Sequence, residues 1–353
     1  MNKIIRILAA CIWVLLAMPA ALAVPSDIPE VLTQPSIVTP KAMKAAMLAI
    51  ANAGARLVAV GERGIILLSD DAGKTWRQVP TPVQVSLVAV RFANAHTGWA
   101  VGSLGVVLHT SDGGETWSKQ LDGIQAASIV AQAAVTPEQQ TAAKRLVNDG
   151  PDKPFLDLYF KDELNGYIIG AYNLIFRTTD GGKSWQAWQQ HVKNPRGWDL
   201  YGIRPDGGEL FIVGEQGTLL GSHDDGATFE PIASPYKGSY FGLVVGKEGQ
   251  VVIFGLRGNV FWSGDMGHSW KKIDTGSTVT ISAGIRLTDG TLVLVNEAGD
   301  LLISHDNGRH FQLQSGKENL PVAGIAEAND GSLIVVGLRG IKHLAPLAAV
   351  TKQ

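Results

Sequence analysis

The chain has 353 residues, with 30 lysines and arginines against 32 aspartates and glutamates, and a formal net charge of −2. This near-balance, without a clustered basic stretch, excludes nucleic acid as the expected partner. Cys11 is the only cysteine and lies in an apolar N-terminal segment, so a disulfide, a thiol nucleophile and a thiolate metal site are excluded from the chain that follows it.

Residues 1–23 have the features of a secretory signal peptide. Lys3 and Arg6 precede an apolar run from Ile7 to Leu16, and Ala21-Leu22-Ala23 forms a small-residue cleavage signal. The apolar run is too short to span a membrane, and no other stretch approaches the necessary length. Val24, rather than a cysteine, follows the predicted cut, which argues against a lipid anchor. We therefore expect cleavage after Ala23 and a soluble periplasmic or secreted protein, without direct membrane insertion.

Six later segments share the frame S/T-x-D-x-G-x-(S/T/H)-(W/F), beginning with Ser69-Asp70-Asp71-Ala72-Gly73-Lys74-Thr75-Trp76. The Asp side chain can accept hydrogen bonds from nearby backbone N–H groups, and Gly supplies the positive φ of a tight turn. Six acids at matching positions could instead be metal or catalytic ligands, but identical repeats favour a structural role in each turn. The acids concerned are Asp71, Asp112, Asp180, Asp224, Asp265 and Asp306.

A second marker, mostly of the form G-x-x-G, precedes each of these hairpins and occurs seven times. The copies begin at Gly61, Gly102, Gly170, Gly214, Gly255, Asn296 and Gly337, at offsets of 41, 68, 44, 41, 41 and 41 residues. A period near 41 with about four short strands per unit is typical of a β-propeller blade. We predict an all-β fold, a single seven-bladed propeller over residues 24–353, with six blades as the alternative.

The last blade is predicted to lack an outer strand of its own, because the chain ends after three strand patterns. Residues 31–38 supply a candidate, so we expect an N-terminal strand to close the ring and remove the free edges. The offset of 68 marks an insertion of about 27 residues, over roughly 123–154, between blades 2 and 3. Thr136-Pro137-Glu138 is typical of a helix start and Asp149-Gly150-Pro151 of a stop, so the insertion is predicted to be helical.

The residues that surround the second hairpin resemble a known family. The segment Asn94-Ala95-His96-Thr97-Gly98-Trp99-Ala100-Val101-Gly102, ahead of Thr110 to Trp117, is similar to the photosystem II stability/assembly factor family of Asp-box (BNR repeat) propellers, and residues 162–170 repeat it with Tyr167 in place of the tryptophan. This resemblance implies a seven-bladed propeller that acts without enzymatic activity as a scaffold on membrane-protein assembly intermediates. We accordingly expect a monomer that docks onto a membrane or envelope protein complex and needs neither cofactor nor metal.

Candidate partner-binding residues follow from propeller geometry, in which the turn between the second and third strands shares a face with the blade-to-blade connections. That face should carry the helical insertion and the arginines of the G-x-R-G turns. Arginine suits bidentate recognition of carboxylates, although each could instead serve solubility or pair with a nearby acid. Aromatic residues near the entries to blades 4 and 5 could form an exposed patch or pack in the core. The predicted set is Arg63, Arg257, Arg339, Arg196, Trp198, Tyr201 and Tyr240.

One charged residue interrupts the small residues of the innermost strands. The aligned column is Ala49, Ala89, Asp157, Gly202, Gly242, Gly284 and Gly324. Asp157 could hold a cation or a cationic group in the central channel. The alternative is a solvated side chain or a partner for a neighbouring arginine, because an unpaired buried carboxylate would be costly.

Two further function classes remain as alternatives to a scaffold. A sialidase-like glycosidase would need an arginine triad and paired acids, and the usual Arg-Ile-Pro motif is absent, since Ile203-Arg204-Pro205 has a different order. The sequence also lacks G-x-S-x-G and H-E-x-x-H motifs. A ligand- or glycan-binding propeller would use the channel mouth, with Tyr240, Trp198 and Asp157 as its platform. We expect a protein without catalytic residues.

Overall fold

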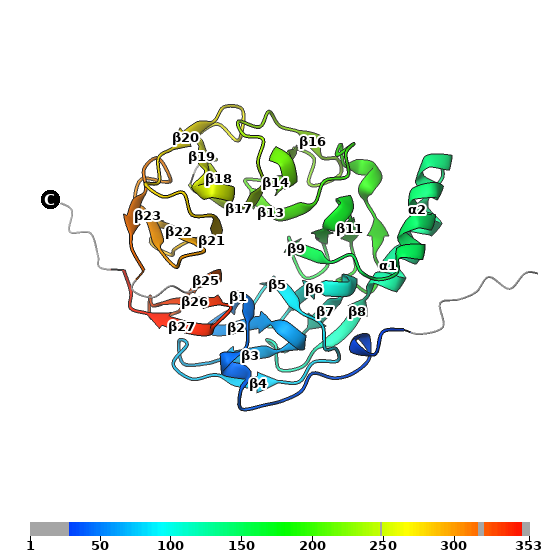
Figure 1. The fold of residues 1–353 in the computed structure, drawn as a ribbon, viewed down its shortest axis with the longest axis horizontal. Coiled ribbons are helices and arrows are strands. Elements are labelled where there is room, and N and C mark those ends of the chain that lie inside the picture. The colour runs from blue at the N-terminus through cyan, green and yellow to red at the C-terminus, as the bar shows by residue number, and fades with distance from the viewer. Residues whose placement is uncertain (1–27, 248, 317–320, 348–353) are drawn as a thin grey trace, which may run out of the picture.

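The computed structural model describes residues 28–247, 249–316 and 321–347, so the predicted signal segment lies outside the described residues. Seven antiparallel sheets surround a central axis like the blades of a propeller (Figure 1). Their innermost strands contact one another in sequence order, and the first also contacts the last, so the ring is closed. The prediction of an all-β, seven-bladed propeller is confirmed.

Each blade is built from consecutive strands that run outward from the axis. Blades 1 to 3 comprise β1 (Met47–Ala53), β2 (Arg56–Gly61), β3 (Ile66–Ser69), β4 (Arg77–Val79), β5 (Leu87–Phe92), β6 (Gly98–Gly102), β7 (Val107–Thr110), β8 (Ser118–Leu121), β9 (Phe155–Phe160), β10 (Gly166–Gly170), β11 (Ile175–Thr178) and β12 (Gln186–Ala187). Blades 4 and 5 comprise β13 (Leu200–Asp206), β14 (Glu209–Gly214), β15 (Leu219–Ser222), β16 (Glu230–Pro231), β17 (Tyr240–Val245), β18 (Val251–Gly255), β19 (Val260–Ser263) and β20 (Lys271–Ile273). Blades 6 and 7 comprise β21 (Ile281–Arg286), β22 (Leu292–Asn296), β23 (Leu301–Ser304), β24 (Gln312–Gln314), β25 (Val322–Glu327), β26 (Leu333–Gly337) and β27 (Gly340–Leu344).

The turn between the second and third strands explains the repeated G-x-x-G marker. At the first position, Gly102 has extended backbone, but a Cβ there would lie 2.0 Å from the carbonyl oxygen of Ser86. At the fourth position, Gly105 has φ +64, which favours glycine. Glycine is therefore needed at the first position because another backbone segment lies close to it, and at the fourth position because the backbone is left-handed there.

The core of the molecule lies between the blades. Every residue of β6 and β10 is buried, because each of these second strands is covered by a neighbouring blade on both faces. Trp99 of β6 stacks on Phe160 of β9, with ring centroids 3.4 Å apart and an angle of 5° between the ring planes. Side-chain packing of this kind joins separate sheets into one ring.

The predicted closure of blade 7 by an N-terminal strand is wrong. The sheet of blade 7 has three strands in the described part of the chain, and residues 31–38 lie instead against blade 1. The N–H of Ser36 donates to the carbonyl of Thr81 at 2.8 Å, and the N–H of Gln84 donates to the carbonyl of Val31 at 2.8 Å. Leu32, which is fully buried in the apolar cluster between blades 1 and 2, anchors the segment there. Burial of this side chain explains why the segment does not reach blade 7.

The ring is closed by packing between blades 7 and 1 rather than by a shared sheet. Strand β1 contacts both β25 and β26, and Met47, Ile50 and Leu57 share an apolar cluster with Ala326 and Ile334. A short 3₁₀ segment, η2 (Ala42–Lys44), also contacts β27. Each blade is therefore formed by one continuous stretch of chain.

The insertion between blades 2 and 3 forms two helices, α1 (Gly123–Ala133) and α2 (Pro137–Asp149). Both begin with a capping box, in which Asp122 is paired with Gln125 and Thr136 with Gln139. The prediction of a helix that starts at Thr136 and ends at Asp149 is confirmed, and α1 is an additional helix. None of the helices in the described ranges is long and apolar enough to cross a membrane.

Candidate functional site

The strand pairing assigns the loops to two faces of the ring. In blade 2, Leu87 at the start of β5 pairs with Gly102, where the G-x-x-G turn begins. Phe92 at the end of β5 pairs with Gly98, which itself pairs with Thr110 at the start of the Asp-box. The G-x-x-G turns, the blade connections and the insertion therefore share one face, and the Asp-boxes lie on the opposite face.

A groove lies on the G-x-x-G face, between the insertion and blade 3, and has a volume of about 460 Å³. Its walls come from α1, α2, the blade 3 turn η5 (Ala171–Asn173) and the connection from blade 3 to blade 4. The apolar part of the lining consists of Val130, Ala133, Ala134, Ala142, Leu146, Leu174 and Ala187. Its size and apolar lining with a few polar groups at the rim are typical of ligand and peptide sites.

The rim of this groove is rigidly built around Tyr172. Its side chain is 66% exposed, and its backbone has φ 54, followed by Asn173 at φ 60. The N–H of Tyr172 donates to Asp199 Oδ1 at 2.8 Å, and Asn194 Nδ2 donates to Asn173 Oδ1 at 3.0 Å. Lys153 Nζ lies 5.0 Å from the centre of the tyrosine ring. The same left-handed pair occurs in the equivalent turns of other blades, and blade 3 differs only in having Asn173 where those turns have glycine, a replacement that asparagine tolerates.

The predicted aromatic patch divides between this rim and the core. Arg196 is exposed between Pro195 and Gly197, which both line the groove, and Trp198 is half-buried beside them. Tyr201 is half-buried, and burial raises its pKa to about 12.

Tyr240 was predicted as a partner-binding residue, and this prediction is wrong. The side chain is 0% exposed and packs edge-on against Phe261, and its hydroxyl lies 2.9 Å from Ser234 Oγ. Burial raises the pKa of Tyr240 to about 12. As the first residue of β17 it faces the neighbouring blade, so it stabilises the ring and reaches no partner.

The arginines of the G-x-R-G turns are all exposed on the same face as the groove. Arg63 and Arg257 occupy the left-handed position of their turns, with φ 52 and 58. Arg339 lies in the corresponding turn of blade 7. None of the contacts between described residues joins one of these arginines to another, so their action as one patch remains a prediction.

Asp157 is 3% exposed and is paired with arginines rather than free in the channel. Arg91 Nη2 lies 3.4 Å from its Oδ1, Arg204 Nη1 contacts its Oδ2, and the N–H of Ile203 donates to Oδ2 at 3.1 Å. Burial raises the pKa of Asp157, while Arg91 and the N–H of Ile203 act in the opposite direction. This geometry favours the alternative of a partner for neighbouring arginines.

The Asp-box carboxylates bind their own turns. In the first box, Asp71 accepts hydrogen bonds from the Thr75 N–H at 2.8 Å and the Thr75 hydroxyl at 2.6 Å, and Ser69 Oγ donates to it at 2.8 Å. The hydrogen bonds from Thr75 lower the pKa of Asp71 to about 2. The same pattern recurs at Asp112, Asp180, Asp224, Asp265 and Asp306. In the described part of the chain no group of three His, Cys, Asp or Glu side chains could hold a metal ion.

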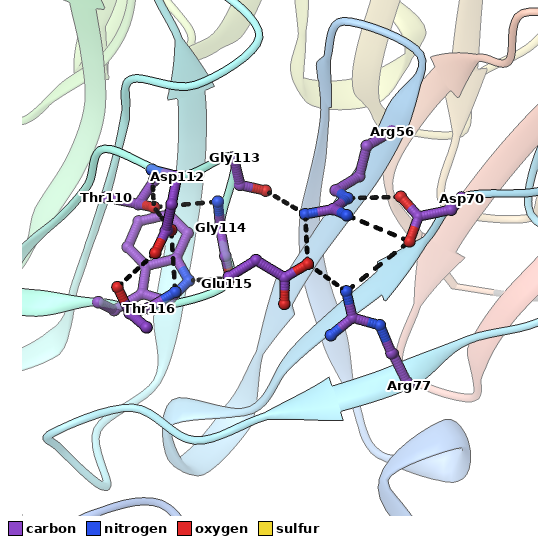
Figure 2. A network of polar contacts seen from close by, with 10 residues as sticks. Arg56, Asp70, Arg77, Thr110, Asp112, Gly113, Gly114, Glu115 and Thr116 are labelled. Carbon is purple, nitrogen blue, oxygen red and sulfur yellow. Dashed lines mark hydrogen bonds and ion pairs between the residues drawn. The ribbon is translucent and has the colours of Figure 1, made fainter.

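An ionic network joins the Asp-boxes of blades 1 and 2 (Figure 2). Arg56 Nε donates to Asp70 Oδ1 at 2.5 Å, and Arg56 Nη1 lies 2.8 Å from Glu115 Oε1. Arg77 Nη2 also donates to Glu115, at 2.5 Å (Figure 2). Hydrogen bonds from Arg56 lower the pKa of Asp70, and those from Arg77 lower that of Glu115. Sequence reasoning missed this network, although Asp70 and Glu115 occupy variable positions of adjacent repeats.

Sequence reasoning also missed three arginines in the channel, Arg91, Arg204 and Arg286, which line a second cavity of about 440 Å³. The predicted column is wrong in blade 6, where the strand pairing places Ala283 rather than Gly284 in it, so Arg286 follows the column by three positions and no sequence signal marks it. A signal was present for Arg91 and Arg204, because each follows a member of the column by two positions. Side chains two apart in a strand lie on the same face, so the column predicts that these residues face the channel as well.

Solved structures with the same fold include both binding proteins and enzymes. The structure of YCF48 bound to D1 peptide has a TM-score of 0.65 at 19% identity and covers 88% of this chain and 96% of that chain. The GH74 xyloglucanase from Xanthomonas campestris has a TM-score of 0.64 at 13% identity and covers 91% of this chain but 54% of the enzyme. At these identities the likeness shows the fold alone.

Comparison of the sequence with known proteins assigns the chain to a family, which the shared fold alone does not. Photosystem II assembly lipoprotein Ycf48 of Synechococcus sp. (strain CC9902) is 26% identical over 156 residues, which are 43% of this chain and 46% of the relative. The match thus spans about half the length of the curated relatives. The family model described as photosynthesis system II assembly factor YCF48 matches residues 68–132 and 136–311, which is more than half of the chain. With Asp-boxes, blade count and sequence match in agreement, this chain belongs to the YCF48 family of photosystem II assembly factors.

Proposed function

We propose that this chain is a non-enzymatic periplasmic propeller that docks as a monomer onto a membrane or envelope protein complex and assists its assembly. The observation that carries the proposal is the groove between α1, α2 and η5, on the face that also bears Arg196 and the G-x-R-G arginines. Family membership supports an assembly role, and the signal-like segment 1–23 supports export.

The groove fits an apolar segment of a partner protein with polar ends. Its floor is made of alanines, Val130 and Leu146, while Gln139 and Gln190 at the rim can hydrogen-bond to a bound backbone. A relative with the same fold has been solved with a D1 peptide bound, which supports a peptide segment as the kind of ligand. The capped helices and the hydrogen-bonded rim present this surface without a need for ordering, which reduces the entropic cost of binding.

The side chains of the channel are unsuited to glycoside hydrolysis. Tyr159 is the only described tyrosine among the channel lining residues, and burial raises its pKa, which opposes formation of a nucleophilic phenolate. Asp157 is buried behind the channel wall and engaged with Arg91 and Arg204, and neither Asp nor Glu is among the described lining residues. A paired-carboxylate mechanism therefore has no support in the channel.

The test fills the groove without disturbing the core. Ala142 lines the groove from the exposed side of α2, so Ala142→Trp should block it, while Gln140→Trp places the same ring on α2 outside the groove lining. Crosslinked pull-downs from the native envelope should recover a membrane complex with the unmodified chain and with Gln140→Trp. With Ala142→Trp the recovery should fall at least about tenfold, as expected when a central contact is lost.

Equal recovery with both tryptophan variants would place the docking surface elsewhere. If no membrane complex is recovered with any of the three chains, the scaffold function itself is rejected.

A further inference from the structure

The cavity at the centre of the ring is lined by the inner strands β5, β9, β13, β17 and β21 and lies away from the groove. All charged side chains among its described lining residues are arginines, namely Arg91, Arg204 and Arg286. We propose that this cavity binds a small anion that carries at least two carboxylate or phosphate groups, which the three guanidinium groups hold.

The arginines come from three different blades. Arg91 lies on β5 of blade 2, Arg204 on β13 of blade 4 and Arg286 at the end of β21 of blade 6. Each lies toward the end of its inner strand, which is the end nearest the Asp-box face. The three positive charges thus surround the channel mouth on the face opposite the insertion, and a ligand there would not compete with a partner in the groove.

Charge balance leaves this cavity positive. Among the described residues Asp157 is the carboxylate that contacts these arginines, and it binds Arg91 and Arg204. Arg286 has no ion pair among the described residues, and its Nη1 donates to the carbonyl of Gly246 at 3.1 Å. Three guanidinium groups against one carboxylate leave a deficit of two negative charges, which a dianion would supply.

Most of the guanidinium donors remain available to a ligand. Each arginine has five N–H donors in a planar fork that matches carboxylate and phosphate oxygens. Arg91 uses one of its terminal nitrogens, at 3.4 Å from Asp157, and its side chain is 36% exposed. Arg286 is exposed at the end of β21, so its guanidinium group is open to a ligand as well.

The need for two anionic groups follows from the spacing of the blades. Arg91 and Arg204 meet at Asp157, whereas Arg286 is bound to a carbonyl that follows β17 of blade 5. One ligand group can pair with the first two arginines beside Asp157, and a second is required for Arg286. A cavity of about 440 Å³ has room for such a molecule.

Isothermal titration calorimetry with the purified protein at low ionic strength tests this site, with citrate as the carboxylate probe and inorganic pyrophosphate as the phosphate probe. We expect at least one probe to bind, and the probe that binds more tightly identifies the class of ligand. Arg286→Ala should weaken binding at least about tenfold, because it removes a charge-assisted hydrogen bond. Arg286→Lys should restore part of the affinity, since it keeps the charge but loses the planar fork.

The matched control is Arg257→Ala, which removes an exposed arginine from the opposite face and should leave the affinity unchanged. Thermal unfolding checks that each variant is folded. Crystals of the unmodified protein soaked in tungstate give an independent measurement, with an anomalous peak expected between Arg204 and Arg286. Absence of binding for both probes, equal binding by Arg286→Ala and the unmodified protein, or a cavity without tungstate would overturn the proposal.

Discussion

The hydroxyl, the carboxylate and the glycine of each Asp-box cooperate over a distance of only a few residues. In blade 2, Thr110 Oγ1 donates to Asp112 at 2.8 Å and accepts from the Gly114 N–H at 2.9 Å. Asp112 in turn accepts from the N–H and the hydroxyl of Thr116, at 3.0 and 2.6 Å. The turn is thereby closed from both sides, and Trp117 is placed in the space between blades 1 and 2.

Replacement of Asp112 by alanine should therefore lower the free energy of unfolding by about 1 kcal/mol, the net value of such solvent-accessible hydrogen bonds. Urea unfolding followed by tryptophan fluorescence measures the change. Ser111→Ala is the matched control, because Ser111 is an exposed member of the same turn and makes no hydrogen bond to a described residue. A similar loss in both variants would show that the carboxylate has no special role.

Residue patterns predicted the turns correctly and failed for Tyr240 and the channel arginines. The Asp-box and G-x-x-G frames depend on contacts within about five residues, so the sequence carries them fully. Whether Tyr240 faces the solvent or the next blade depends on the register of β17 against β18, which shifts between Tyr240 and Gly242. The same shift occurs in the inner strand of every blade, and the first residue of each of these strands is buried, so alignment of the repeats contains this information although a cluster of aromatic residues does not.

Among the elements, the insertion is the one that makes this propeller different from a regular ring. Its second helix is held at its start by the capping box of Thr136 and Gln139. Because α2 is exposed on most of its surface, its stability depends on this cap more than a core helix would. Because α2 forms a wall of the groove, loss of this cap should also loosen that wall.

Thr136→Ala should weaken α2 by about 1 kcal/mol, since it removes the cap to the Gln139 N–H. Hydrogen exchange of the amides in residues 138–149 should become about fivefold faster. Thr141→Ala is the control, because Thr141 lies inside the same helix and its hydroxyl only bonds back to the Pro137 carbonyl. Faster exchange in Thr141→Ala but not in Thr136→Ala would contradict the proposed role of the cap.

Local signals predicted the boundaries of α2 but not the position of residues 31–38. Proline after a threonine cap and glycine after Asp149 are signals that a helix carries in its own sequence. The place of an extended segment, by contrast, is decided by distant partners, here the backbone of Thr81 and the apolar cluster in which Leu32 is buried. The groove could not be foreseen either, because its walls meet only after blades 3 and 4 are in place.

For the molecule as a whole, the Asp-box carboxylates couple stability to pH. Hydrogen bonds lower the pKa of Asp71 and Asp265 to about 2. Their ordinary value in an unfolded chain is about 4. A carboxyl group with a lowered pKa in the folded state contributes stability above its unfolded pKa, and that contribution is lost as the pH falls through the folded pKa.

The midpoint of urea unfolding should therefore stay nearly constant from pH 7 to about pH 5 and fall steadily between about pH 4 and pH 2. Replacement of Asp71 by asparagine should make this fall less steep. A midpoint that rises as the pH is lowered from 4 to 2 would contradict the assignment of these carboxylates.

The packing of blade 7 against blade 1 joins the two ends of the chain and can form only late in folding. Asn52 Nδ2 donates to the carbonyl of Glu327 across 275 residues of sequence. Contacts so far apart carry the largest loop-closure entropy and can form only when the last blade has been synthesised. Until then the incomplete ring exposes Met47, Ile50 and Leu57 on its first blade, an apolar surface through which partly made chains can aggregate.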